Sequence, residues 1–141
     1  MRDLRELVGM EAPPAVFEVT RERIRELAGA IGDANPVYQR GDAASPTFPT
    51  TFRFDLGIPD FERYLAVHGE EEYVYERPIL PTDIITSKRR LIDVRQRQSS
   101  LGEISLLNWV TEHTDSRGEL IFVRKTTTIL RDTQGEDEQD G

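Results

Sequence analysis

The apolar positions near the start of the chain follow the spacing of one amphipathic helix. Apolar residues recur at steps of three and four from Ile24 to Ile31, with charged residues at most positions between them. Thr20 can cap the first turn, and Gly32 begins a polar turn that stops the helix. We therefore predict a helix over residues 20–31, preceded by a short strand.

Residues 33–60 have the composition of a loop, rich in Gly, Pro, Asp, Ser and Thr. Three phenylalanines predict that this loop is ordered and anchored in the core: Phe48, Phe52 and Phe54. Apolar residues at positions 61, 64, 65 and 67 then fit helical spacing. We expect a second short helix there, ending near Gly69.

From residue 70 onward, the apolar residues follow the spacing of strands. The pattern predicts four strands, over residues 73–76, 83–97, 103–113 and 119–131. A short polar connection containing Gly118 favours a hairpin between the last two. The third strand is apolar on both faces, so we expect a second subunit to cover part of the sheet. A helix followed by long antiparallel strands indicates an α+β fold.

The chain length of 141 residues fits a single domain. Lys and Arg number 18 against 26 Asp and Glu, which gives a formal charge of -8 and argues against nucleic-acid binding. Five acidic residues lie at the C-terminus, so we expect residues 132–141 to form a disordered acidic tail.

The sequence offers little for metal or membrane chemistry. It has no cysteine and only two histidines, His68 and His113, so we expect no metal and no cofactor. Apolar windows fall short of the ~18 residues of a membrane span, and the N-terminus lacks the apolar run of a signal peptide. We expect a cytoplasmic protein with neither a membrane nor a nucleic-acid partner.

The most specific motif lies at residues 32–38. It runs Gly-Asp-Ala-Asn-Pro-Val-Tyr, and Ala44 follows six residues later. This resembles the signature of the MaoC-like hydratases and dehydratases, Gly-Asp-x-Asn-Pro-aliphatic-His with a small residue six further on. The family's His is Tyr38 here. Further similar stretches extend the resemblance, to the N-terminal MaoC-like dehydratase domain, over residues 15–131, after an N-terminal segment at residues 1–14.

The resemblance implies a hot-dog fold, an antiparallel sheet wrapped around a central helix. It also implies action on 3-hydroxyacyl or 2-enoyl thioesters of coenzyme A or acyl carrier protein, with an Asp and a His holding the reacting water. A Tyr has an ordinary pKa near ~10, against ~6.5 for His, so Tyr38 is a hydrogen-bond donor rather than a base at neutral pH. We therefore predict a subunit that works with a histidine-bearing MaoC-like partner.

Two alternatives remain open at this point: a self-sufficient homodimeric hydratase using Asp33, and a non-enzymatic module that binds acyl thioesters. The candidate catalytic residues are Asp33, Asn35 and Tyr38. The candidate substrate-binding residues are Phe48, Phe52 and His68.

Each candidate also has a structural interpretation. Asp33 and Asn35 can satisfy backbone groups of a turn, and Tyr38 can be a half-buried packing residue. His68 can cap a helix end, whereas His113, near the predicted hairpin, is expected to be solvated.

A basic run at residues 88–90, followed by Arg95 and Arg97, has two interpretations. It could meet the phosphates of coenzyme A or the acidic face of a carrier protein. It could also be an exposed strand edge, where charges discourage aggregation, and we favour this second interpretation.

Overall fold

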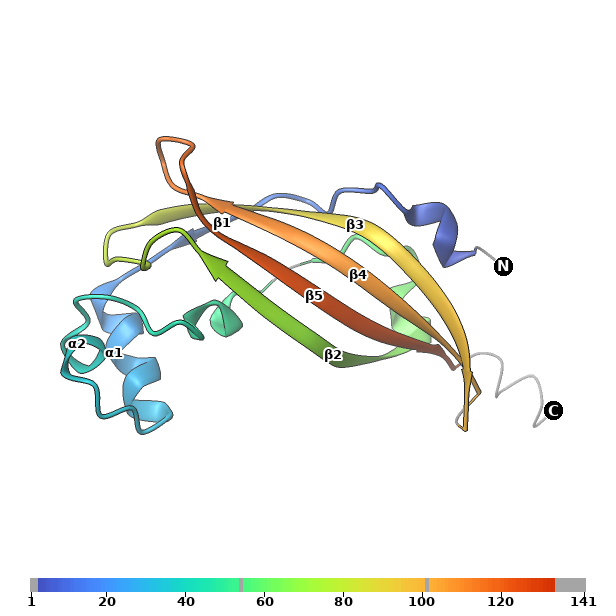
Figure 1. Ribbon diagram of the computed structural model, residues 1–141, viewed down its shortest axis with the longest axis horizontal. Helices are drawn as coiled ribbons and strands as arrows, with labels where there is room; N and C mark the ends of the chain where they lie inside the picture. The colour runs from blue at the N-terminus through green and yellow to red at the C-terminus, as the bar shows by residue number, and fades with distance from the viewer. Residues whose placement is uncertain (1–2, 54, 101, 134–141) are drawn as a thin grey trace.

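A five-stranded antiparallel sheet in the order β1-β3-β4-β5-β2 forms the body of the molecule (Figure 1). The computed structural model describes residues 3–53, 55–100 and 102–133. The strands are β1 (Ala15–Glu18), β2 (Tyr64–Tyr75), β3 (Ile84–Ser99), β4 (Gly102–Thr114) and β5 (Leu120–Asp132). The helices are α1 (Arg21–Ala30) and α2 (Pro36–Arg40), with 3₁₀ turns η1 (Leu4–Leu7), η2 (Phe48–Thr51) and η3 (Phe61–Arg63).

The first predicted helix is confirmed as α1. The Thr20 side chain accepts a 3.2 Å hydrogen bond from the Arg23 backbone N–H, as expected of the capping residue. Val19 and Ile24 are buried in one cluster, which fixes the entry into the helix. Helices α1 and α2 lie together at one end of the sheet (Figure 1).

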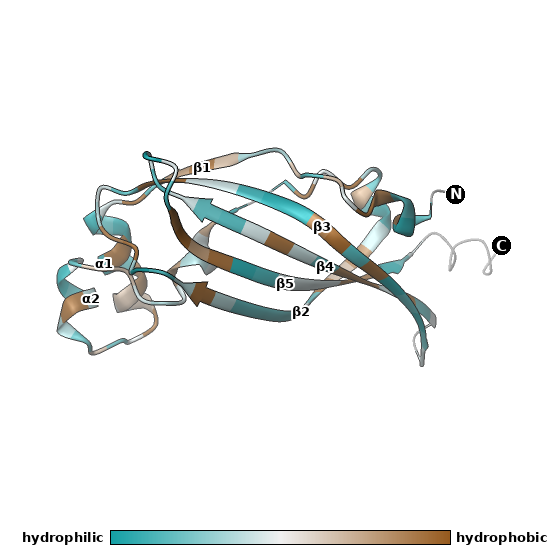
Figure 2. Cartoon of the chain, turned by 45° about the horizontal axis from the view of Figure 1, so that its top comes forward, coloured by the Kyte–Doolittle hydropathy of each residue, from teal (hydrophilic) through white to brown (hydrophobic). Residues whose placement is uncertain are grey.

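The strands predicted over residues 83–97, 103–113 and 119–131 are confirmed as β3, β4 and β5. In β4 every second residue from Ser105 to His113 is buried, and the residues between them are half-buried or exposed. Figure 2 shows short hydrophobic and hydrophilic stretches following one another along the strands. A backbone bond of 2.9 Å from Asp115 to Glu119 closes the predicted hairpin between β4 and β5.

The helix predicted to end near Gly69 is wrong. Only residues 61–63 form a 3₁₀ turn, and β2 begins at Tyr64. The apolar positions in this segment fit both periods, and pairing with β5 along the whole of β2 decides for the strand. Gly69 lies at a bulge between His68 and Glu70 instead of ending a helix.

Two apolar clusters fill one face of the sheet, which we call the covered face. The cluster near α1 contains Val19, Ile24, Ala44, Phe48, Phe52, Ile79, Ile85, Ile121 and Phe122. The far cluster contains Leu4, Ile58, Leu91, Val94, Leu107, Trp109 and Leu130. The N-terminal segment contributes Leu4 to the far cluster, and its residues 9–12 form backbone bonds with β3.

The predicted acidic tail and the predicted core residue Phe54 are described only in part. Asp132 ends β5 and pairs with Arg63, so the expected tail starts inside the sheet. Residues 134–141 of that tail and the expected core residue Phe54 lie outside the described residues. Within the described ranges, no helix has the length and apolar character needed to cross a membrane.

Candidate functional site

The motif at residues 32–38 forms the link between α1 and α2. Gly32 takes a φ of 68°, a conformation that favours glycine after a helix. The Asp33 Oδ1 accepts the Asn35 backbone N–H at 2.9 Å, and the Asn35 Oδ1 accepts the Val37 N–H at 3.0 Å. Asn35 is therefore the N-cap of α2, with Pro36 in its first turn. Both side chains thus accept backbone N–H groups in this link, as their structural interpretation predicts.

A pocket of about 500 Å³ lies where this link meets the end of β2. Its wall is formed by Asn35, Val37, Tyr38, Ala43, Ala44, Pro46, Tyr75, Glu76, Arg77 and Pro78. The Tyr75 hydroxyl donates a 2.6 Å hydrogen bond to the Pro46 carbonyl, which holds the loop against the strand. Burial, and secondly the neighbouring Tyr38, raise the pKa of Tyr75, so it stays a neutral donor. The pocket is thus mainly apolar with tyrosine hydroxyls in or near its wall.

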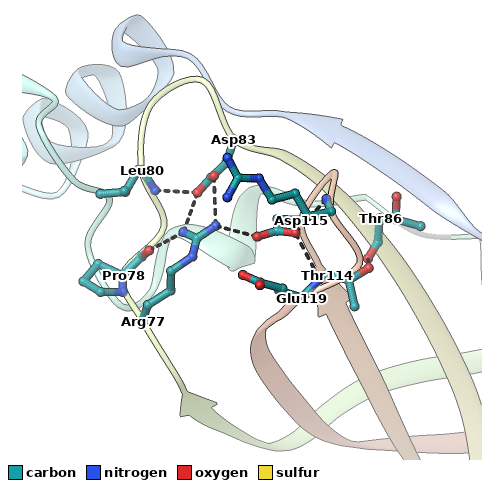
Figure 3. Close-up of polar contacts among 9 residues, drawn as sticks. Arg77, Pro78, Leu80, Asp83, Thr86, Thr114, Asp115 and Glu119 are labelled. Atoms are coloured by element: carbon teal, nitrogen blue, oxygen red, sulfur yellow. Dashed lines mark hydrogen bonds and ion pairs between the residues drawn. The ribbon is translucent and has the colours of Figure 1, made fainter.

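Arg77 ties three segments together beside this pocket (Figure 3). Its guanidinium donates to both oxygens of Asp83 at 2.8 and 3.0 Å, and to Asp115 in the β4–β5 hairpin at 3.5 Å. Asp83 also accepts the Leu80 N–H at 2.8 Å. The hydrogen bonds to Asp83 raise the pKa of Arg77, so its charge is permanent. This cluster fixes the turn that follows β2 and, with it, one side of the pocket.

The structure brings only part of the predicted site residues together. Asn35 and Tyr38 line the pocket, and Tyr38 is half-buried as expected of a packing residue. Asp33 is half-buried in the preceding turn, outside the lining. Phe48 and Phe52 are buried in the core near α1, with their ring centroids 5.9 Å apart, and neither lines this pocket.

His68 lies in the middle of β2 and therefore does not cap a helix. Its exposed ring approaches Glu71, with Nε2 3.5 Å from Oε2. Residues 68 and 75 are seven positions apart on the strand, which corresponds to roughly 20 Å. His68 is thus remote from the pocket that Tyr75 lines.

The expectation that His113 is solvated is wrong, because the residue is 0% exposed. Its Nδ1 lies 2.6 Å from the Ser87 hydroxyl, and its ring stacks on Phe122 with centroids 3.9 Å apart. Burial, and secondly the charge of Arg89, lower the pKa of His113 to about 3. The available signal was its alternation in phase with Leu107 and Trp109, which was outweighed by its closeness to the hairpin.

The basic run at residues 88–90 is not uniformly exposed, because Arg89 is only 6% exposed. Its Nε donates a 2.9 Å hydrogen bond to Thr111, and its guanidinium lies 5.8 Å from the Trp109 ring centroid. Burial lowers the pKa of Arg89 to about 10. Because side chains alternate along β3, Lys88 and Arg90 point outward and Arg89 points into the covered face.

A polar belt on the covered face separates the two apolar clusters. It consists of Arg89, Thr111, Arg124 and Tyr73, which are consecutive partners across β3, β4, β5 and β2. Arg124 pairs with Glu71, also from β2. Within the described part of the chain, no group of three or more His, Asp or Glu residues could hold a metal ion.

The curled antiparallel sheet with its short helices defines a hot-dog fold, as predicted. The chain belongs to the family described as FAS1-like, dehydratase domain region, which matches residues 6–124. It is 32% identical over 146 residues to a UPF0336 protein of Streptomyces coelicolor, covering 89% of this chain and 93% of that relative.

Solved structures show the same fold. A MaoC-like dehydratase from Rhodospirillum rubrum superposes with a TM-score of 0.69 at 19% identity, covering 89% of this chain and 92% of that one. A chain of the HadBC (3R)-hydroxyacyl-ACP dehydratase complex from Mycobacterium tuberculosis gives 0.68 at 24% identity, covering 87% and 96%. These structures share the hot-dog fold with the chain, and the family model confirms the predicted relationship to dehydratase domains.

Proposed function

We propose that this chain is a subunit of a hydratase or dehydratase for 3-hydroxyacyl and 2-enoyl thioesters, and that a histidine-bearing hot-dog partner supplies the catalytic dyad. The observation that carries the proposal is the pocket at residues 35–38, which has Tyr38 where the family motif has its histidine. The HadBC (3R)-hydroxyacyl-ACP dehydratase complex supports a partner of the same fold.

The chemistry explains why a partner is needed. Dehydration breaks the C–H bond at C2 and the C–O bond at C3, and the departing hydroxyl takes up a proton to leave as water. A base and an acid with a pKa near neutrality suit these transfers, which a tyrosine does not provide. Asp33 already holds the Asn35 N–H through Oδ1, and the imidazole of His113 is buried in the sheet.

This chain contributes binding surface. Val37 and Tyr38 face the end of β2 across the pocket, and Tyr75 closes it from the strand. Apolar walls suit the acyl thioester, while the Tyr38 hydroxyl can donate to a carbonyl oxygen. Coenzyme A and acyl carrier protein present the same thioester, so the pocket lining does not distinguish the two carriers. Homodimer formation and a cytoplasmic location stay predictions.

An activity assay tests the proposal. The purified chain is given a short and a long 2-enoyl coenzyme A thioester, alone and after co-expression with a histidine-bearing MaoC-like subunit, and loss of the enoyl absorbance is followed. We expect turnover only from the co-expressed pair. Hydration by the chain alone would instead support the self-sufficient homodimer. If neither preparation turns over but the thioester raises the melting temperature of the chain, the protein is a binding module.

A further inference from the structure

Three buried donor groups on the covered face have no hydrogen-bond partner among the described residues. They are the indole N–H of Trp109 and the hydroxyls of Thr126 and Tyr73. Trp109 is 1% exposed and Thr126 is 5% exposed. Nearly all buried polar groups in folded proteins are paired, because an unpaired group has given up its hydrogen bonds to water for nothing. Three such groups in one region therefore need a physical explanation.

The three donors lie close together because their residues are neighbours across the sheet. Trp109 on β4 is the direct partner of Thr126 on β5. Two residues away on β5, Arg124 is the direct partner of Tyr73 on β2. Direct partners in an antiparallel pair have Cβ atoms roughly 4.5–5.5 Å apart. The unpaired donors thus lie in the polar belt and in the row of residues next to it.

Two buried guanidiniums add positive charge to these donors. The Arg89 guanidinium lies 5.8 Å from the ring centroid of Trp109, and that of Arg124 lies 5.7 Å from the ring centroid of Tyr73. Burial lowers the pKa of Arg89 and of Arg124 to about 10, so both stay charged at neutral pH. The side chains of these two rows carry two positive charges and one negative charge, that of Glu71, which pairs with Arg124. The region therefore favours an anion.

A carboxylate matches these groups better than water does. It brings only acceptors, with about four lone-pair sites on its two oxygens, whereas a water molecule also brings two O–H donors. The groups on both sides of the belt are apolar, since Trp109 belongs to the far cluster and Tyr73 packs against the cluster near α1. The remainder of the ligand is therefore aliphatic.

We propose that the polar belt, together with Trp109 and Thr126, binds the carboxylate of a free aliphatic acid, and that the unpaired donors are kept for its oxygens. In the described part of the chain, none of the belt residues lines the pocket at residues 35–38, so this is a second site. A free acid has no thioester, so the site goes beyond the proposed hydratase chemistry.

The first test measures binding of octanoate to the full chain by isothermal titration calorimetry. Acetate presents the carboxylate without the chain, and 1-octanol presents the chain without the charge. We expect octanoate to bind, and each of the two controls to bind at least about tenfold more weakly, because the site needs both parts of the ligand.

The second test removes single hydroxyls. Tyr73→Phe and Thr126→Val each delete one unpaired donor and keep the shape of the side chain. We expect each variant to bind octanoate about tenfold more weakly, since a hydrogen bond to a charged group is lost. The melting temperature of the free protein should not fall, because these hydroxyls have no partner to lose among the described residues. If one variant does not fold, the other still tests the site.

Two matched controls remove hydroxyls that are paired. Tyr75→Phe makes the same exchange two residues along β2, where the hydroxyl donates to the Pro46 carbonyl. Thr127→Val makes the same exchange beside Thr126, where the hydroxyl donates to Asn108 Oδ1 at 2.8 Å. We expect both controls to keep the affinity for octanoate and to lower the melting temperature by about 3 °C.

Four results would overturn the proposal. Octanoate could fail to bind, or bind no tighter than 1-octanol. Tyr73→Phe and Thr126→Val could both keep the native affinity. They could lose as much stability as the paired controls, which would show that buried water already satisfies their hydroxyls. Tyr75→Phe alone could weaken binding, which would place the acid in the pocket at residues 35–38.

These tests contain no thioester, so their failure would remove the carboxylate site and leave the hydratase proposal standing. Conversely, an inactive co-expressed pair would refute the proposed function and leave a positive octanoate result intact.

Discussion

The Ser87 hydroxyl lies 2.6 Å from Nδ1 of His113, across the β3–β4 pair, where the histidine ring is fully buried against Phe122. An imidazole in this position stays neutral, because its pKa is lowered to about 3 by burial and secondly by Arg89. In the unfolded chain the same group has a pKa near ~6.5. This difference makes the stability of the fold depend on pH.

The direction of that dependence follows from proton binding. Below about pH 6.5 the unfolded chain binds a proton at His113 that the folded chain does not. The stability contributed by the neutral, buried imidazole is therefore fully present above pH 6.5 and is lost as the pH falls toward 3. Between pH 6.5 and 5 we expect the free energy of unfolding to fall by about 2 kcal/mol more in the native chain than in His113→Gln, measured by urea denaturation. Equal slopes for His113→Gln and the native chain would show that His113 does not titrate differently on folding.

Two Gly→Ala variants, at positions 41 and 29, form a matched pair whose free energies of unfolding can be compared. A Cβ on Gly41, which has a φ of 75°, would lie 2.5 Å from Arg21 Cγ and 2.8 Å from the Arg21 carbonyl oxygen. At Gly29, inside α1, a Cβ would meet no atom within 4 Å. We expect Gly41→Ala to lower the free energy of unfolding by about 1–3 kcal/mol and Gly29→Ala to raise it by about 0.5–1 kcal/mol, measured by thermal unfolding. A Gly41→Ala protein of native stability would contradict the close approach at this turn.

Arg77 is expected to stabilise the turn beside the pocket. Replacement by Met keeps the apolar stem but leaves Asp83 and Asp115 without their cation. We expect Arg77→Met to cost about 1–2 kcal/mol of unfolding free energy and to weaken thioester binding, as followed by calorimetry. The control Arg5→Met removes the exposed pair with Asp3 at 2.7 Å and should change the melting temperature little. Equal effects of the two variants would show that the three-segment cluster has no special role.

Position 38 tests the role of the tyrosine that stands where the resembling motif has a histidine. Tyr38→His restores the family motif in a side chain that lines the pocket. We expect this variant, without a partner, to hydrate a short 2-enoyl thioester about 10²-fold above the uncatalysed rate, since positioned acid-base groups contribute this much. The control Tyr38→Phe should remain inactive. If Tyr38→His is folded but inactive, residue 38 is not what disables the chain.

The helices could be predicted from the sequence more fully than strand β2, for a physical reason. Helix α1 was predictable because its cap at Thr20 and its apolar spacing lie within a few neighbouring residues. The N-cap role of Asn35 was available in the same way, as an Asx residue directly before proline. In β2, the residues from Tyr64 to Val67 fit a helix or a strand, and distant pairing with β5 chose the strand.

The sequence by itself determined the α+β class, helix α1, the long strands and the motif at residues 32–38, because these depend on local order and residue type. The hot-dog class came from the resemblance of that motif and its flanking stretches to a known family. Only the tertiary structure decided that Arg89 and His113 point into the covered face, that residues from the motif, the following loop and the end of β2 form one pocket, and that β2 has an open edge. Strand phase and neighbour identity depend on which segments pair across the sheet. Such pairing joins residues far apart in the chain, so no local pattern specifies it.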